Sequence, residues 1–183
     1  MYMVKTCSLL DLRESLNASG GKKFKVTTFC KIIEMDRSVF YSVYKNGSRD
    51  LFVSVIEIEI NKHFMKAQNN SKVDSGHIMD SIILQIRNNW KIYRWMYESL
   101  NYEGLAYVRE NLIDCIFRNF QDYAFNRKGI SKNRLKPIVN CIYSQLFDWT
   151  INGCEVATVE IHAALKQFVP MLEGHRCDAD LMW

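Results

Sequence analysis

The sequence contains little glycine or proline and no long apolar run. Eight Gly and two Pro, Pro137 and Pro170, interrupt its 183 residues. Apolar residues recur at steps of three and four over most of the length, which is typical of helices. Because glycine and proline are the residues that most often end helices, we expect an all-α fold. No apolar stretch approaches about 18 residues and the N-terminus lacks a secretory signal, so we expect no membrane partner and a cytoplasmic location.

Spacings typical of catalytic and metal sites are missing as well. The six cysteines include no Cys-x-x-Cys pair, and the four histidines show no spacing that would hold zinc. A phosphate-binding Gly loop and a Gly-x-Ser-x-Gly motif are also absent, which favours a protein that is not an enzyme. We expect no metal or other cofactor, and mostly buried free thiols at Cys7, Cys30, Cys115, Cys141, Cys154 and Cys177.

The net positive charge comes from the N-terminal third of the chain. Residues 1–66 contain 11 Lys or Arg and 7 Asp or Glu, whereas residues 67–183 contain 13 of each, so the whole net charge of +4 lies in the first segment. A solvated basic face accounts for this asymmetry, and so does a module that faces phosphates.

Periodic segments predict eight helices in two parts. In residues 1–50 we expect helices at 7–18, 26–33 and 37–44, with Gly20-Gly21 ending the first and Thr27 or Thr28 capping the second. In residues 51–183 we expect a helix at 51–65, a polar tract at 66–76, and longer helices at 78–100, 104–126, 132–151 and 155–172.

The stretch TTFCKIIEMDRSVFYSVYKNGSRDLF, residues 27–52, carries the most specific pattern. It predicts two short helices joined by a tight turn at Met35-Asp36. In the second of these, Phe40 and Tyr44 share one face, because successive residues advance by about 100°. The other faces carry the small side chains Ser38, Val39 and Ser42 and the larger side chains Arg37 and Tyr41.

This segment resembles the TetR family of bacterial transcriptional regulators. The resemblance rests on a small residue at Ser38, an aromatic pair at Phe40-Tyr41, a further aromatic at Tyr44, and the turn from Lys45 to Asp50-Leu51. Glu34 stands where that family commonly has a turn glycine, Val43 stands where it commonly has a histidine, and the turn KNGSRDL is one residue longer than usual.

The resemblance implies a helix-turn-helix DNA-binding domain at residues 1–50 and a helical effector-binding and dimerisation domain at residues 51–183. It implies a repressor that binds a palindromic operator as a homodimer and is released by a small-molecule effector. A recognition helix must fit a groove about 12 Å wide and offer hydrogen-bond donors. The candidate DNA-binding residues are Thr27, Thr28, Arg37, Ser38, Val39, Tyr41, Ser42 and Lys45, with Val39 placed to touch a thymine methyl group.

The second part supplies the other expected sites. Its aromatic-rich helices suggest a ligand pocket, although core packing alone gives the same pattern; the candidate residues are Ile86, Trp90, Tyr93, Tyr97, Tyr107, Phe117 and Phe120. The apolar faces of the last two helices suggest a four-helix dimer interface, with candidate residues Leu135, Ile138, Ile142, Trp149, Val156, Val159 and Ala163. A helical adaptor that binds another protein and no DNA is the alternative function.

Overall fold

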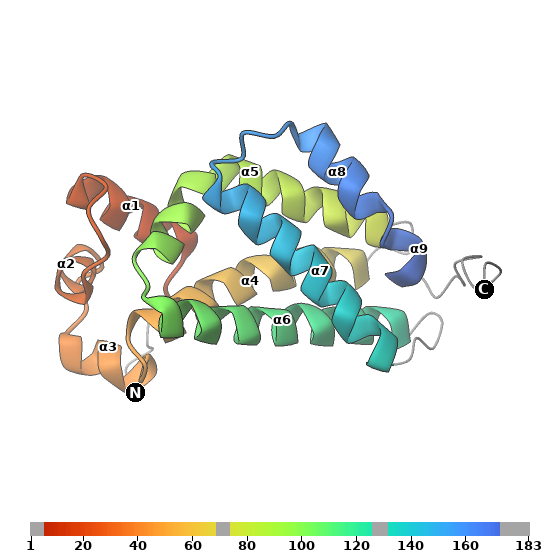
Figure 1. Cartoon of the computed structure of the whole chain (residues 1–183). Coiled ribbons are helices and arrows are strands. Elements are labelled where there is room, and N and C mark those ends of the chain that lie inside the picture. The colour runs from red at the N-terminus through yellow and green to blue at the C-terminus, as the bar shows by residue number, and fades with distance from the viewer. Residues whose placement is uncertain (1–5, 69–73, 126–131, 173–183) are drawn as a thin grey trace. The chain divides into compact units, whose positions relative to one another are not determined.

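The chain is helical throughout the residues that the structure, a computed structural model, describes, which are 6–68, 74–125 and 132–172 (Figure 1). No strand is found in these residues, which confirms the predicted all-α class. None of the described helices is both long and apolar enough to cross a membrane. The helices are α1 Leu9–Ser19, α2 Val26–Ile32, α3 Arg37–Val43, α4 Ser48–Gln68, α5 Ser75–Glu98, α6 Tyr102–Phe125, α7 Lys132–Ile151, α8 Thr158–Lys166 and α9 Val169–Leu172.

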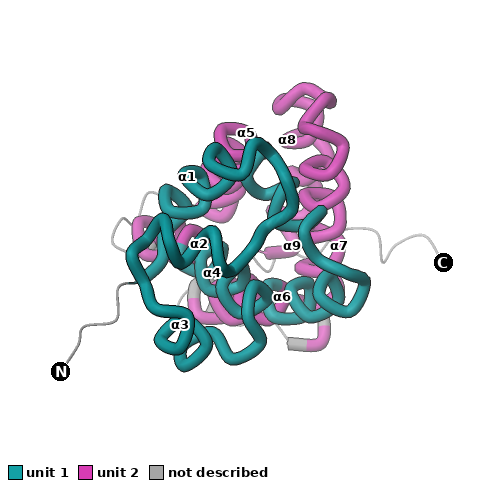
Figure 2. The backbone as a smooth tube through the Cα atoms, turned by 90° about the vertical axis from the view of Figure 1, so that its left-hand side faces the viewer, with its two compact units in different colours: residues 1–58, 91–112 teal, residues 59–90, 113–183 magenta. Residues whose placement is uncertain are grey.

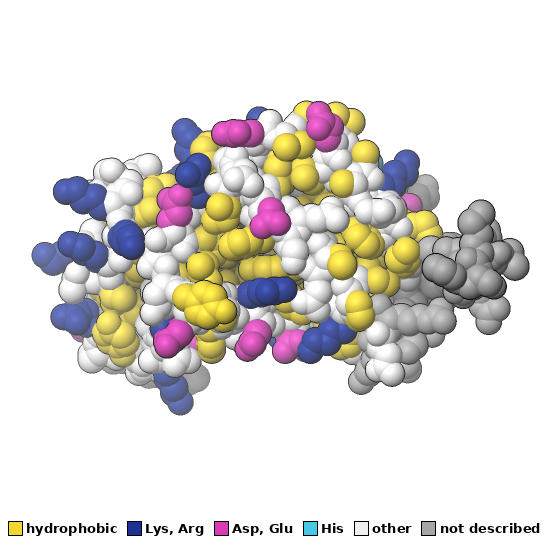
Figure 3. Space-filling view, viewed as in Figure 1, with side chains coloured by type: hydrophobic (Ala, Val, Ile, Leu, Met, Phe, Trp, Pro, Cys, Tyr) yellow, Lys and Arg dark blue, Asp and Glu magenta, His cyan; other side chains and the backbone are white. Residues whose placement is uncertain are grey.

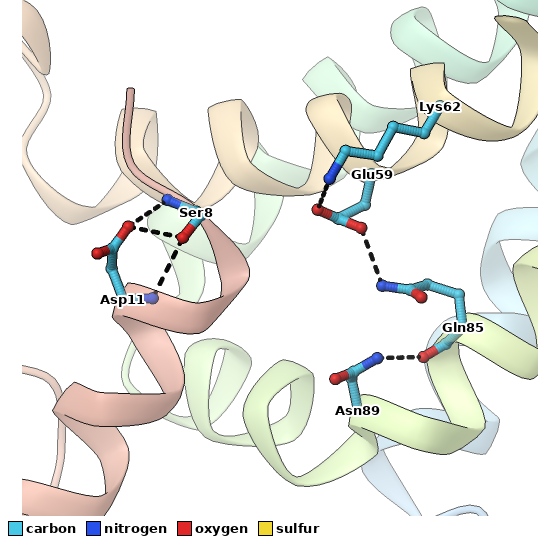
Figure 4. A network of polar contacts seen from close by, with 6 residues as sticks. All are labelled: Ser8, Asp11, Glu59, Lys62, Gln85 and Asn89. Atoms are coloured by element: carbon cyan, nitrogen blue, oxygen red, sulfur yellow. Dashed lines mark hydrogen bonds and ion pairs between the residues drawn. The ribbon is translucent and has the colours of Figure 1, made fainter. Parts of the chain in front are cut away.

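Helix α1 has strong signals at both ends. At its start the Ser8 hydroxyl accepts from the Asp11 N–H, and the Asp11 carboxylate accepts from the Ser8 N–H at 2.7 Å, which is a capping box (Figure 4). At its end Gly20 takes a left-handed conformation with φ 58° and donates to the Asn17 carbonyl, while Gly21 donates to the Leu16 carbonyl. These two bonds form a Schellman motif, as the predicted Gly20-Gly21 stop requires.

Two predicted details of the helix ends are wrong. Helix α2 begins at residue 26 as predicted, but its N-cap is Lys25, so neither Thr27 nor Thr28 caps it. The N–H groups of Thr28 and Phe29 both donate to the Lys25 carbonyl, which puts the cap two or three residues earlier than predicted. The predicted last helix is divided into α8 and α9, because Pro170 has no N–H with which to continue α8.

The chain forms two compact units that do not follow the order of the sequence (Figure 2). Unit 1 contains residues 1–58 and 91–112, and unit 2 contains residues 59–90 and 113–183. Helices α4, α5 and α6 each contribute residues to both units. The domain boundary predicted after residue 50 therefore falls inside α4, which is continuous.

Each unit has its own apolar core. Large side chains that are fully buried in unit 1 are Leu12, Phe29, Phe40, Leu51, Phe52, Met96 and Leu112. In unit 2, Phe64 and Phe120 pack edge to face with ring centroids 4.8 Å apart, beside buried Ile78, Met79 and Ile83.

Polar contacts join the middle of α4 to the middle of α5 within unit 2. Glu59 accepts from Lys62 at 2.6 Å and from the Gln85 amide at 3.1 Å, and the Asn89 amide donates to the Gln85 carbonyl at 2.9 Å (Figure 4). The carboxylate of Glu59 is thus shared between two helices, and the Asn89 amide, although buried, is satisfied.

The thiols largely follow the prediction. Four of them are buried, Cys141 is exposed, and none of these five described cysteines forms a disulfide. Cys177 lies outside the described residues. The described residues also contain no group of His, Cys, Asp or Glu that could hold a metal ion.

Candidate nucleic-acid interface

The connection between α2 and α3 is short and tightly determined. Glu34 has a left-handed backbone with φ 54°, and the next residue, Met35, donates its N–H to the Cys30 carbonyl at 2.9 Å. This bond is the longer one of a Schellman motif, in which the left-handed position usually carries glycine. Asp36 is the N-cap of α3, although its side chain makes no capping hydrogen bond. The four residues 33–36 therefore set the direction in which α3 leaves α2.

Aromatic side chains hold the inner face of α3. Phe40 is fully buried and meets Phe29 of α2 with centroids 6.1 Å apart, and it meets Tyr44 at 5.1 Å. Phe24, just before α2, contacts Phe29 at 5.4 Å and Phe52 of α4 at 5.1 Å. Burial and the neighbouring Cys7 raise the pKa of Tyr44 far above its usual range, so its phenol stays neutral. These rings make α3 a rigid support for whatever its outer face binds.

The outer face of α3 exposes most of the predicted DNA-contacting residues. Thr28 is half-buried, and the exposed ones are Thr27, Arg37, Ser38, Val39, Tyr41, Ser42 and Lys45. The Tyr41 ring stands edge-on to Phe40 at 5.3 Å and remains 43% exposed. The segment thus combines a packed inner face with an accessible outer one, as its spacing predicted.

One predicted role on this face needs revision. Ser42 was expected to donate outward, but its hydroxyl donates to the Val39 carbonyl of the preceding turn at 2.7 Å. Serine has one O–H donor and two acceptor lone pairs. Ser42 therefore offers a binding partner only an acceptor, and sequence alone does not reveal this because it depends on the rotamer.

Exposed cations surround α2 and α3. Residues 22–45 contain six Lys or Arg and two Asp or Glu, an excess of four positive charges over 24 residues. No ion pair among the described residues involves any of the six, so they are available to an anionic partner; they are Lys22, Lys23, Lys25, Lys31, Arg37 and Lys45. Figure 3 shows Lys and Arg side chains gathered over the α1 to α3 segment.

The structure adds binding candidates that the sequence prediction omitted. Four lysines, at 22, 23, 25 and 31, are exposed beside the predicted set. Val43 is 40% exposed on α3 next to Val39 at 39%. The basic cluster GGKKFKVTTFCK in the sequence could have indicated that these lysines bind an anionic partner. Val43 could not have been found in this way, because an apolar valine is usually predicted to lie in the core.

Four residues from α5, α6 and the loop between them, which we call the clasp, support the α2–α3 pair within unit 1. They are Trp95, Ser99, Asn101 and Tyr107. The Trp95 indole donates to the Lys22 carbonyl at 2.6 Å, and the Ser99 hydroxyl accepts from the Phe24 N–H at 2.9 Å. Both bonds hold the loop that leads into α2. Residues separated by more than seventy positions meet here, which no periodicity can predict.

The other half of the clasp holds the turn between α3 and α4. The Tyr107 hydroxyl donates to Asp50 at 2.7 Å, and the same carboxylate accepts from the Asn46 N–H at 2.8 Å. Asn101 accepts from Arg49 at 3.3 Å. Partial burial raises the pKa of Asp50, but the bonds from Asn46 and Tyr107 outweigh it and hold the pKa below its usual value. The bond to Asp50 in turn raises the pKa of Tyr107.

The predicted ligand-pocket residues are divided between the units. Tyr93, Tyr97 and Tyr107 belong to unit 1, and Ile86, Trp90, Phe117 and Phe120 belong to unit 2. Tyr93, Tyr97 and Phe120 are buried, and the hydroxyl of Tyr107 is engaged by Asp50. The half-buried members within unit 2 are Ile86, Trp90 and Phe117.

The predicted dimer residues also separate into two groups. Leu135, Ile142 and Trp149 of α7 are buried within unit 2, where the Trp149 indole donates to the Val156 carbonyl at 2.9 Å. Ile138 is half-buried, and the exposed members are Val156, Val159 and Ala163. Val159, 71% exposed, is the most accessible apolar side chain of α8. A partner would therefore meet α8 and the residues just before it.

No family model matches the chain, and neither a curated protein nor a solved structure matches it.

Proposed function

We propose that the protein is a DNA-binding transcriptional regulator that represses its targets by binding a palindromic operator as a homodimer. The observation that carries the proposal is the combination, on residues 22–45, of an accessible α3 face with six exposed cations that form no ion pair with described residues. The resemblance of the same segment to TetR regulators supports it.

The dimensions of α3 suit a major groove. An α-helix with its side chains is about 10 to 12 Å across, and the groove is about 12 Å wide. Ser38 and Ser42 point away from Phe40 and are short, so the helix backbone can approach the base edges. Arg37 at the start of α3 and Lys45 just beyond its end are placed to bind phosphates, while Arg37 also has the geometry to pair with a guanine.

The test is binding to duplex DNA selected from a random library. If a dimer neutralises about 6 to 10 phosphates, affinity should fall roughly 10³- to 10⁵-fold between 50 and 200 mM salt. Lys31→Ala should weaken binding and make the salt dependence less steep, whereas Lys66→Ala, which removes an exposed lysine of α4 in unit 2, should change neither. A flat salt response with folded protein refutes DNA binding and leaves the helical adaptor.

The dimer is proposed to form through α8 and the residues just before it, because the predicted α7 residues Leu135, Ile142 and Trp149 are buried within unit 2. Exposed apolar side chains at Val156 and Val159, with Ala163 one turn further along α8, give a surface that a second copy can cover around a two-fold axis. That axis would place the two α3 helices about 34 to 36 Å apart, one turn of DNA, and so require a palindrome. A monomer in sedimentation at micromolar concentration contradicts this part.

Release by a small apolar or aromatic ligand completes the proposal. We place the ligand in unit 2 near Ile86, Trp90 and Phe117. It can lower DNA affinity only if it binds one of two conformations better, with a coupling of about 1 to 3 kcal/mol. Operator DNA must then weaken ligand binding by the same factor. A panel of aromatic metabolites that changes neither the melting temperature nor DNA affinity removes the effector from the proposal.

A further inference from the structure

The exposed surface of α3 consists of three lengthwise rows. At about 100° per residue, Ser38 and Ser42 lie opposite buried Phe40 and form the central row. The same rotation puts Arg37 and Tyr41 on one flank. It puts Val39 and Val43 on the other flank, which we call the valine row. One side of the helix is therefore polar and cationic, and the other is apolar.

The valine row is accessible and rigid. Its two side chains are 39% and 40% exposed, although burial is the usual environment of valine. Each is branched at Cβ, which restricts its χ1 angle and lowers helix propensity, so neither residue favours a short exposed helix. Residues four apart on a helix have Cβ atoms about 5 to 6 Å apart. Two methyl-bearing groups are thus presented at a fixed spacing.

In the major groove the thymine C5-methyl is the apolar group that a side chain can meet. Successive bases of one strand rise about 3.4 Å, so the valine spacing lies between one base step and two. Ser42 adds a second preference. In the rotamer of the structure its hydroxyl proton goes to the Val39 carbonyl, so it offers lone pairs that suit an adenine or cytosine amino group.

We infer that the valine row, Val39 and Val43, reads two thymine methyl groups that are adjacent or one base apart in each operator half-site. The inference rests on the proposed DNA binding and specifies which class of sequence is bound. The cations around residues 22–45 supply attraction to any duplex, and the valine row selects among duplexes. The selected operators should therefore contain a paired thymine element flanked by a position where Arg37 meets guanine or phosphate.

The experiment replaces thymine by uracil in a duplex selected for tight binding. Uracil removes the methyl group and leaves the hydrogen-bonding edge intact. A buried methyl contributes about 0.8 kcal/mol, so each uracil at the paired positions should weaken binding by the unmodified protein roughly fourfold. In Val39→Ala, one of the two uracil effects should vanish; in Val43→Ala, the other should vanish. Alanine at these exposed positions favours the helix, so both variants should fold.

The control is Lys31→Ala, which should weaken binding to the thymine and uracil duplexes equally and leave their ratio unchanged. Tight binding without any uracil effect overturns the inference while the DNA-binding proposal stands. The same conclusion follows if the uracil effects persist in both alanine variants, or if the selected half-sites lack thymine. Failure to bind any duplex overturns the proposed function and the inference together.

Discussion

Replacing Glu34 by glycine should stabilise the protein. Glu34 holds φ 54° at the end of α2, where the Met35 N–H donates to the Cys30 carbonyl. Helix α1 ends in the same motif with Gly20 at φ 58°, and α7 ends with Gly153 at φ 71° and a bond from the Cys154 N–H to the Trp149 carbonyl. Of these three ends, only α2 has a residue other than glycine directly after the helix in this conformation; at the end of α7 a second left-handed residue, Cys154 with φ 53°, follows Gly153.

The size of the gain follows from two opposing effects. A left-handed conformation costs a residue with a Cβ roughly 1 to 2 kcal/mol. Glycine removes that cost but makes the unfolded chain more flexible, which costs about 0.4 to 1 kcal/mol. The net gain for Glu34→Gly is therefore about 1 kcal/mol in the free energy of unfolding. For a chain of this length that corresponds to a rise of about 2 to 4 °C in Tm.

Urea unfolding followed by circular dichroism measures the effect, as a higher midpoint with an unchanged slope. Two variants separate the backbone from the carboxylate. Glu34→Ala keeps the Cβ and should give no gain. Gly20→Ala should lower the free energy of unfolding by about 1 kcal/mol through backbone strain. No steric clash adds to this effect, because a Cβ at Gly20 meets no atom within 4 Å. Equal stabilisation by Glu34→Ala and Glu34→Gly would refute the backbone explanation and point to the charge.

Three further changes test other features. Ser8→Ala removes the cap of α1 and should lower the free energy of unfolding by about 1 kcal/mol, measured in urea. Because the folded-state pKa of Asp50 is lowered, its stabilising contribution is complete above its unfolded pKa of about 4 and is lost as pH falls through the folded value. Tyr107→Phe removes one hydrogen bond that lowers this pKa, so it should lower the free energy of unfolding by about 1 kcal/mol at pH 7. The further drop in the free energy of unfolding below pH 4 should then be smaller than in the unmodified protein. An unchanged dependence of stability on pH would contradict the role of that bond. Val159→Glu should convert the proposed dimer to a monomer in sedimentation, whereas Leu84→Glu, at another exposed apolar position on α5, should leave the dimer intact.

Local patterns in the sequence predicted the helices well where the apolar stripe was long. Helix α7 begins and ends at the predicted residues, 132 and 151, and α3 starts at Arg37 as expected. The sequence failed where a boundary depends on one backbone bond. The cap of α2 was missed, although its start at residue 26 was predicted, because Lys25, which has no usual capping side chain, supplies the carbonyl that begins the helix.

Two properties of the candidate interface lay beyond sequence patterns. The direction of the Ser42 hydroxyl depends on its rotamer, and a search for donors assigns it the wrong role. The clasp joins Trp95 to Lys22 and Tyr107 to Asp50, and these pairs are 73 and 57 residues apart. Periodicity describes how a helix presents its faces, but it contains no information about which distant helix covers them.

The clasp also governs when unit 1 can fold during synthesis. A nascent chain that has emerged only to residue 58 lacks Trp95 and Ser99, so the loop before α2 has no partner for the Lys22 carbonyl or the Phe24 N–H. Unit 1 is complete only after residues 59–112 have been added. At about 5 to 20 residues per second this takes roughly 3 to 10 s, during which the aromatic side chains around Phe24 lack the Trp95 ring that packs against them 5.6 Å away. Residues 22–45 are therefore translated early but acquire their final structure only after residues 59–90, the first third of unit 2, and residues 91–112 have also been made.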